Sequence, residues 1–331
     1  TEDSINNTES FLRSVLSLTD IGKQFLENID IESTTSIITP NDVNPSSFLL
    51  RPTLLNNINS PLVLPCITPR FIPTCTPESL TGLGLLSYKY GLPVQSHLSE
   101  SLNEINFVRS LHPNSLTYGH IYHEYGLLHK ATLMGHCVHC SELELSILKD
   151  TNTSIIHCPS SNYLLGSGIM DMKRYLNKNI LIGLGTDVAG GASTSMLDCI
   201  RNTITASRSM GIKMRGDSIP LGFQETSTVI TNNESNNETN NETKEEYRWL
   251  TTNEAFYLAT IGGAEAVGMD HVFGNFIPGK KLDCLVIDVN APDGPIDTFE
   301  NETIVNHFEK FIYLGDDRNI KHVIVDGKIV I

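Results

Sequence analysis

Short apolar runs alternate with helix-like stretches through the middle of this chain, and this alternation limits the folds that it can adopt. Between about residue 61 and residue 215 the apolar runs are PLVLPCITPRF, GLPVQSH, ATLMGH, TSIIHC and ILIGLGTD, and a stretch with helical spacing follows each of them. Runs this short and this apolar are typical of buried parallel strands in β–α–β units. The sequence therefore predicts an α/β fold built on a parallel sheet.

A polar or charged residue stands at or close to the end of each apolar run. In chain order these residues are Arg70, His97, His136, His157 and Asp187, at intervals of 27, 39, 21 and 30 residues. Such intervals are typical of a β/α barrel, in which the C-terminal ends of the strands form the rim that carries the active site. A closed barrel needs eight strands, so five units predict only the later portion of one.

Capping residues mark the expected helix starts. Thr76, Ser99 and Ser141 each precede a helix-like stretch and have a Glu nearby, which is the pattern of helix N-termini. Glu100 lies three residues after His97 and has two interpretations. It is either a first-turn carboxylate favoured by the helix dipole or a partner of His97 in a reaction.

Composition divides the chain into two predicted parts. Residues 1–275 are expected to form the partial barrel, and an Asn/Glu/Thr-rich tract at 218–248 is expected to be a disordered insertion. Residues 276–331 contain the β-type runs KLDCLVIDV and HVIVDGKIVI, the second with an Asp-Gly hairpin signal. We predict a small β-rich domain there.

Charge and hydropathy exclude some classes of partner. A net charge of −15 argues against nucleic acid, which is bound through clustered Lys and Arg. No apolar run reaches the roughly 18 residues of a membrane span. The start of the chain lacks Met, a basic region and an apolar segment, so we expect a missing beginning and no export signal. Seven irregularly spaced cysteines then favour reduced thiols and a cytoplasmic enzyme.

Two histidines and one aspartate end three different runs of the predicted barrel. His97, His136 and Asp187 would meet at its rim, where imidazole nitrogens and a carboxylate oxygen suit Zn²⁺ or Fe²⁺. A metal ion in such a site lowers the pKa of a bound water to about 7. Asp187 also has an alternative interpretation, as a helix N-cap before the Gly-rich turn that follows it.

Two further strand-end features stay open on the residues alone. Arg70 and Phe71 offer a guanidinium donor and an aromatic face, which suit a flat, carbonyl-bearing ring. The alternative for Arg70 is an ion pair at the rim. His157 is either a pocket residue or a hydrogen-bonded histidine of the rim.

The segment MGHCVHC imitates a zinc-finger cluster. His136, Cys137, His139 and Cys140 lack a second cluster at the usual distance, and no H-x-E precedes them as in the cytidine-type deaminases. We therefore interpret Cys137, His139 and Cys140 as structural residues.

Six segments, taken together, resemble the guanine deaminases of the amidohydrolase superfamily. In chain order they are ITPRF, QSHLSE, MGH, IIHCPSSN, GLGTDVAGG and FIYLGDDRNI. The resemblance extends along the whole chain apart from loops near 31–60 and 218–248. It implies hydrolysis of guanine to xanthine and ammonia on a distorted (β/α)₈ TIM-like barrel with one Zn²⁺, in a homodimer.

The resemblance also implies a role for each matching residue. Zn²⁺ would be held by His97 and Asp187, with His136 holding the hydroxide or lying against the metal. Asp187 would help to deprotonate the water, and Glu100 would carry the proton to the ring and then to the leaving amine. The substrate would contact five side chains: Arg70, Phe71, His97, Glu100 and Asp187.

One expected element of that family is absent from the sequence. The resemblance implies two more zinc ligands in a His-x-His pair, and no such pair occurs in these 331 residues. We therefore expect an N-terminally incomplete chain that alone neither binds zinc stoichiometrically nor deaminates guanine. The alternatives are a catalytically inactive fragment or pseudoenzyme partner of a full-length copy, and another amidohydrolase reaction, such as hydrolysis of a chlorinated triazine or deamination of S-adenosylhomocysteine.

Overall fold

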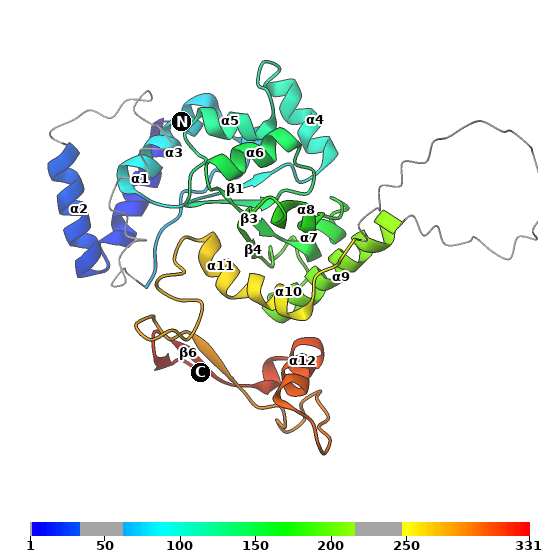
Figure 1. Cartoon of the computed structure of the whole chain (residues 1–331). Coiled ribbons are helices and arrows are strands. Elements are labelled where there is room, and N and C mark those ends of the chain that lie inside the picture. Colours follow the sequence, from blue (N-terminus) through cyan, green and yellow to red (C-terminus); the bar gives the residue numbers. More distant parts are fainter. Residues whose placement is uncertain (1, 34–61, 216–246) are drawn as a thin grey trace, which may run out of the picture.

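A parallel sheet forms the centre of the computed structural model, which describes residues 2–33, 62–215 and 247–331 (Figure 1). The sheet has four strands in the order β1-β2-β3-β4. They are β1 (Val94–Leu98), β2 (Thr132–His136), β3 (Ser154–His157) and β4 (Ile182–Leu184). The predicted α/β class and the parallel sheet are confirmed. Strands that follow one another in chain order are neighbours, as in a β/α barrel.

The first predicted strand is reduced to a single bridge. Ile67 pairs with Val94 in parallel, donating to the carbonyl of Pro93 and accepting from Gln95 at 2.8 Å each. The prediction of a full strand over PLVLPCITPRF is wrong because of its prolines. Pro65 has no N–H to donate to a ladder, and Pro69, two residues after the bridge, has none either.

Helices lie on both sides of the sheet, with α3, α5 and α6 above it and α10 and α11 below it in Figure 1. Their bounds, with one 3₁₀ turn, are η4 (Ile72–Thr74), α3 (Pro77–Tyr90), α4 (Leu102–Leu111), α5 (Tyr118–Glu124), α6 (Glu142–Asp150), α7 (Pro159–Leu164), α8 (Met172–Leu176), α9 (Met196–Arg215), α10 (Thr252–Ala259) and α11 (Ile261–Ala266). None of the helices in the described ranges is long and apolar enough to cross a membrane.

Two of the three predicted helix caps are confirmed. Thr76 and Ser141 form capping boxes at the starts of α3 and α6. Ser99 is not a cap, because α4 begins later, with Ser101 as its N-cap and Glu104 as the reciprocal partner. The more general cap pattern of Ser followed by Glu occurs twice in the segment SESLNE, and only the second copy is used.

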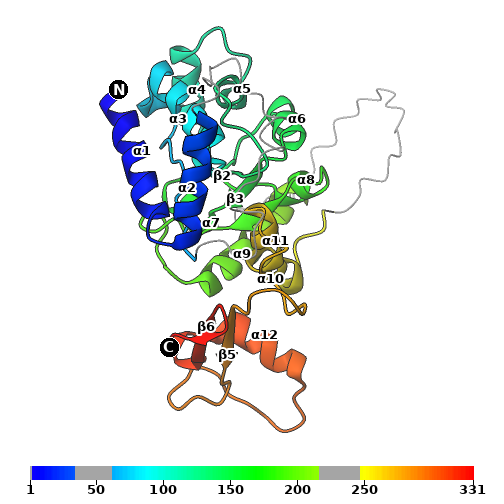
Figure 2. The ribbon, with the colours of Figure 1, turned by 90° about the vertical axis from the view of Figure 1, so that its left-hand side faces the viewer.

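Two N-terminal helices cover one flank of the sheet layer. They are α1 (Glu2–Leu16) and α2 (Asp20–Ser33), and Figure 2 shows them side by side. Leu12 and Leu16 of α1 are buried in the main core. Lys89 of α3 donates to Glu9 at 2.7 Å, which ties α1 to α3.

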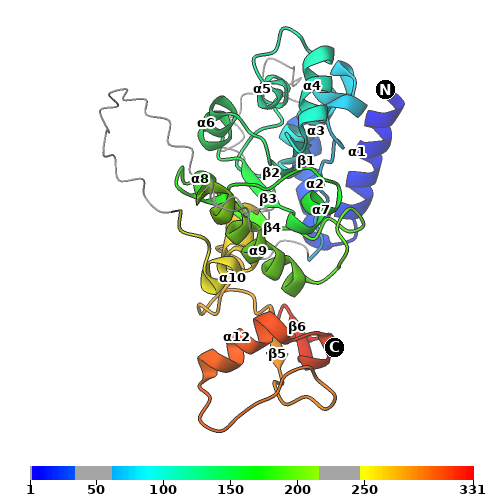
Figure 3. The same cartoon turned by 90° about the vertical axis from the view of Figure 1, so that its right-hand side faces the viewer.

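The C-terminal segment forms a lobe beyond α9 and α10, as Figures 2 and 3 show. Its elements are β5 (Cys284–Ile287), α12 (Ile304–Leu314), the 3₁₀ turn η5 (Asp317–Asn319), β6 (Ile320–Val325) and β7 (Lys328–Ile329). The strands pair antiparallel in the order β5-β6-β7. Asp326 and Gly327 both have positive φ, so the predicted hairpin turn is confirmed. The boundary at 275/276 stays a prediction.

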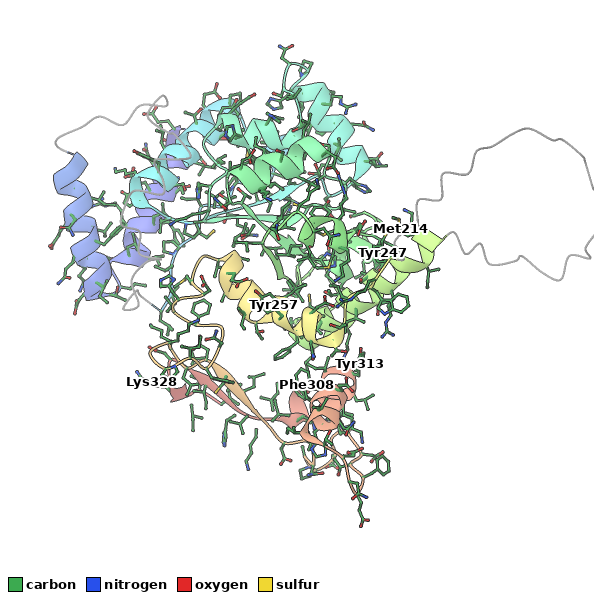
Figure 4. All side chains as sticks on the ribbon, in the orientation of Figure 1. Met214, Tyr247, Tyr257, Phe308, Tyr313 and Lys328 are labelled. Carbon is green, nitrogen blue, oxygen red and sulfur yellow. The ribbon has the colours of Figure 1, made fainter. Side chains whose placement is uncertain are left out.

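Helix α12 attaches this lobe to the rest of the molecule. Arg201 of α9 donates to the carbonyls of Ile312 and Gly315 at 2.7 and 2.5 Å. The rings of Phe256 and Phe308 meet edge to face at 5.0 Å. Figure 4 shows the side chains over the whole ribbon and labels Phe308 and Tyr313 on α12. The predicted insertion at 218–248 lies outside the described residues except for its last two positions.

Replacing Glu254 tests an electrostatic contact between α8 and α10. Burial raises the pKa of Glu254, but hydrogen bonds from the Thr251 backbone and side chain and from Lys173 outweigh it and lower the pKa to about 2. The folded-state pKa lies below the value of about 4.5 in the unfolded chain. The charge therefore stabilises the fold above pH 4.5, and this stabilisation is lost as the pH falls toward 2. Glu254→Gln keeps the capping box and removes the charge.

We expect Glu254→Gln to lower the free energy of unfolding at pH 7 by about 1 kcal/mol, the upper end for exposed pairs. The difference from the wild type should shrink as the pH is lowered from 5 toward 2. Urea denaturation at several pH values measures it, with Glu300→Gln at an exposed position as the control. A difference that does not change with pH would contradict the assignment.

Candidate active site

The register between β1 and β2 places the C-terminal ends of the two strands side by side. Leu98 pairs with His136, so His97 in β1 and the last residue of β2 are close, and their rings meet edge to face at 4.9 Å. Glu100 follows two residues after β1, and Asp187 follows three residues after β4. The four side chains come from the same edge of the sheet, where the carboxyl ends of parallel strands gather.

His136 is the centre of this group. Its Nε2 atom lies 3.8 Å from Glu100 Oε2 and 3.8 Å from Asp187 Oδ2. Its side chain is 2% exposed, against 18% for Glu100 and 29% for Asp187. A buried imidazole therefore faces two carboxylates at the edge of solvent. The structure thus brings together the four residues that the sequence singled out, while their roles stay predictions.

Both alternative interpretations of the carboxylates as helix caps are wrong. Glu100 precedes the N-cap Ser101 and so lies outside the first turn of α4. Asp187 lies nine residues before α9, the next helix after it. Helix capping therefore does not account for either carboxylate.

The backbone at the site adopts a conformation that side chains rarely allow. Ser99, His136, Cys137 and Asp187 have φ values of 48, 66, 50 and 48°. Positive φ in residues other than glycine is uncommon and is concentrated at functional sites. Here it redirects the chain at the ends of β1 and β2 and after β4, so that the side chains converge.

The donor set fits a divalent transition-metal ion. His97, Glu100 and His136 each offer a ligand atom, and these atoms lie within 4.8 Å of one another. The predicted trio contained Asp187 in place of Glu100, and Asp187 Oδ2 lies 3.8 Å from His136 Nε2. Burial, followed by the neighbouring His136, lowers the pKa of His97. The lowered pKa favours the neutral form of His97, which is the form that binds metals.

Two residues that the sequence interpretation missed contact His136 and Glu100. Asn162 Oδ1 lies 2.9 Å from His136 Nδ1, and Ser167 Oγ donates to Glu100 Oε1 at 2.8 Å. Asn162 ends the segment IIHCPSSN, in which only the strand-end His157 was weighed as a candidate. Ser167 belongs to no motif, and no pattern in the sequence indicates its contact.

Arg70 and Phe71 lie beside the group. The Phe71 ring is 6.5 Å from the His97 ring, and the Arg70 guanidinium carbon is 5.5 Å from the centre of the Phe71 ring. Within the described ranges Arg70 forms no ion pair with a carboxylate, so the structure gives no support to the rim ion pair. Arg70 is exposed to solvent.

His157 and the neighbouring cysteines are buried behind this group. Burial and His136 lower the pKa of His157 to about 3, and neither of its ring nitrogens has a hydrogen-bond partner among the described residues. Cys137 and Cys140 are buried free thiols, and His139 Nε2 bonds to the carbonyl of Ser167 at 2.6 Å. Cys137, His139 and Cys140 join no metal-ligand group within the part of the chain that the structure describes.

Sequence comparison identifies the family. The profile of the amidohydrolase family matches residues 48–221 and 223–330. The chain belongs to the amidohydrolase family. It is 41% identical over 268 residues to the guanine deaminase of Dictyostelium discoideum, covering 81% of this chain and 53% of that protein. The guanine deaminase of Escherichia coli K12 is 35% identical over 272 residues, with 81% and 53% covered. This amidohydrolase spans about half the length of these relatives.

A solved structure shares the fold of this amidohydrolase. Guanine deaminase from C. acetobutylicum, with guanine bound in its active site, superposes with a TM-score of 0.67 at 37% identity. The match covers 88% of this chain and 59% of that one. The predicted later portion of a barrel is therefore confirmed as an amidohydrolase fold.

Gly190 leaves room for the Asp187 carboxylate in this amidohydrolase. A Cβ atom at Gly190 would lie 2.7 Å from Asp187 Oδ2 and 3.0 Å from Ser161 Oγ. We expect Gly190→Ala to displace the carboxylate and to weaken binding of a divalent probe ion such as Zn²⁺ about tenfold. This is the lower end of the affinity loss caused by substitutions beside metal ligands.

Titration with Zn²⁺ against a chelating dye measures this effect. Gly263→Ala is the matched control, because its Cβ would make only an ordinary contact, 3.5 Å from the Leu258 carbonyl. Equal Zn²⁺ affinities for the two variants would show that Asp187 is not a ligand.

Proposed function

We propose that this amidohydrolase carries catalytic side chains for the zinc-dependent hydrolysis of guanine to xanthine and ammonia. The observation that carries the proposal is the approach of Glu100 Oε2 and Asp187 Oδ2 to one nitrogen, His136 Nε2, at 3.8 Å each. Two carboxylates beside one buried imidazole can move protons to and from a substrate held between them. Support for guanine comes from the two relatives and the solved structure described above.

The proposed metal ligands are His97, His136 and Asp187. Zn²⁺ held there would lower the pKa of a water molecule to about 7 and so supply a nucleophile at neutral pH. Glu100 takes one proton from the attacking water and hands it to the ring nitrogen next to the amino-bearing carbon as the new C–O bond forms. Asp187 takes the second proton of that water, and Glu100 relays it to the leaving amine. The C–N bond then breaks, ammonia leaves, and both carboxylates are ionised again.

Arg70 and Phe71 form the proposed purine pocket together with His97. The Phe71 ring offers a flat apolar face for the purine, and the Arg70 guanidinium offers donors to its carbonyl oxygen. Two distances support this role: the centre of the Phe71 ring lies 5.5 Å from the Arg70 guanidinium carbon and 6.5 Å from the centre of the His97 ring.

The missing His-x-His pair limits the proposal for the isolated chain. Without two of the ligands that the resemblance implies, we propose that these 331 residues alone neither bind zinc stoichiometrically nor deaminate guanine. The same absence favours the second candidate, a non-catalytic partner of a full-length deaminase. Zinc content after purification with and without such a co-expressed copy separates the two. A homodimer and a cytoplasmic location remain predictions.

A chimera tests the reaction on a chain that supplies the missing ligands. Residues 62–331 replace the matching segment of the Dictyostelium discoideum guanine deaminase. We expect xanthine and ammonia in equal amounts from guanine, and little product from adenine, S-adenosylhomocysteine or a chlorinated triazine. Glu100→Gln in the chimera should lower kcat by about 10²-fold or more, the range for a lost acid–base group. A folded, zinc-loaded chimera without xanthine formation would refute guanine as the substrate.

Phe71→Ala tests the purine pocket in the same chimera. Loss of the aromatic face should raise KM for guanine about tenfold, equivalent to the roughly 1.4 kcal/mol of an aromatic contact, with a smaller change in kcat. Steady-state kinetics measure both constants. Phe107→Ala on α4 is the control, because that ring is 53% exposed and is not among the proposed pocket residues. The same KM for both variants would remove Phe71 from the pocket.

A further inference from the structure

One short segment after β3 contacts two reactive side chains at once. We call residues 158–168 the post-β3 segment; it contains α7 and the turn that follows. Asn162 on α7 bonds to His136 Nδ1 at 2.9 Å, and Ser167 beyond it bonds to Glu100 Oε1 at 2.8 Å. Both residues are almost fully buried, at 2% and 6% exposure.

The post-β3 segment is held in place by its own hydrogen bonds. Ser167 N donates to the carbonyl of Asn162 at 2.8 Å, and Asn162 N donates to the carbonyl of Cys158 at 3.1 Å. His139, from the loop after β2, bonds to the carbonyl of Ser167 at 2.6 Å. Pro159 at the start of α7 adds a fixed φ. The Asn162 amide is therefore presented to His136 from a constrained backbone.

The contact with Asn162 bears on which nitrogen of His136 carries the proton. A neutral imidazole carries one proton, and the nitrogen without it has the free lone pair. When Nδ1 donates to Asn162 Oδ1, the lone pair is on Nε2, the atom that lies 3.8 Å from both Glu100 Oε2 and Asp187 Oδ2. Without an acceptor at Nδ1, the two carboxylates near Nε2 favour the proton there instead.

We propose that Asn162 is a positioning residue that keeps the proton of neutral His136 on Nδ1 and so turns the lone pair of Nε2 toward the site. A ring nitrogen with a free lone pair binds a metal ion, and a hydrogen bond at the other nitrogen selects it. The inference deepens the proposed function, and only its kinetic consequence depends on that function.

Nitrogen NMR of the metal-free, ¹⁵N-histidine-labelled chain tests the proton position directly. Spectra at alkaline pH, where imidazole is neutral, distinguish a protonated ring nitrogen from an unprotonated one. The His136 signals are assigned by their absence in His136→Gln. We expect Nδ1 to carry the proton in the wild type and in Asn162→Asp, which keeps an acceptor. Asn162→Leu, which has a similar shape and no acceptor, should move the proton to Nε2.

Matched variants separate positioning from general loosening of the fold. Asn319→Leu removes another buried Asn, which donates to the carbonyl of Asp288 at 3.0 Å in the C-terminal lobe. Ser167→Ala changes the post-β3 segment without touching the Asn162 contact. Both should keep the wild-type tautomer of His136. A proton on Nε2 in the wild type, or on Nδ1 in Asn162→Leu, overturns the proposal.

Titration with Zn²⁺ alone gives a second readout that does not need activity. Asn162→Leu should weaken Zn²⁺ binding about 10- to 100-fold, the usual effect of losing a group that orients a ligand. Asn162→Asp and Asn319→Leu should stay within about threefold of the wild type. If Asn162→Leu binds Zn²⁺ as the wild type does, Asn162 does not position His136 for a metal.

Guanine kinetics in the chimera keep the two proposals apart. Asn162→Leu should lower kcat about tenfold or more with little change in KM, and Asn162→Asp should restore much of the rate. If the parent chimera does not form xanthine, the proposed function fails. The NMR and Zn²⁺ results still decide on Asn162, because neither requires a substrate.

Discussion

The parallel hydrogen bonding of β1 to β4 is the constraint on which the rest of the structure depends. Because each strand pairs in register with the next, Leu98 lies opposite His136 and His157 lies opposite Leu184. The carboxyl ends of the strands therefore form one edge. A shift by one residue in any pair would turn the polar strand ends to the other face and separate the imidazoles from the carboxylates.

Most of this arrangement follows from simple sequence patterns. The apolar runs locate four of the five expected strands, and each run ends in or near a residue able to do chemistry, such as His97 or Asp187. Buried strands tolerate few polar residues, so polar residues at their ends stand out. The hairpin turn at Asp326-Gly327 could also be predicted from the sequence, because few other residue pairs adopt positive φ at two consecutive positions.

The remaining features depend on contacts between distant residues. Ser101 rather than Ser99 caps α4, and both have a Glu three or fewer residues later, so the local pattern does not choose between them. The contact of Ser167 with Glu100 joins residues 67 positions apart. Arg201 binds carbonyls more than 100 positions away. Periodicity carries no information on pairs of this kind.

The left-handed backbone at the site has a consequence for the stability of the whole chain. For a residue with a Cβ atom this conformation is less favourable by roughly 1 to 2 kcal/mol, and Ser99, His136 and Asp187 all adopt it. Glycine would relieve that strain but would remove the Ser99 hydroxyl, the His136 imidazole or the Asp187 carboxylate. Selection for variants with a higher melting temperature would therefore favour substitutions at these positions. Those variants would lack the side chains that converge at the site.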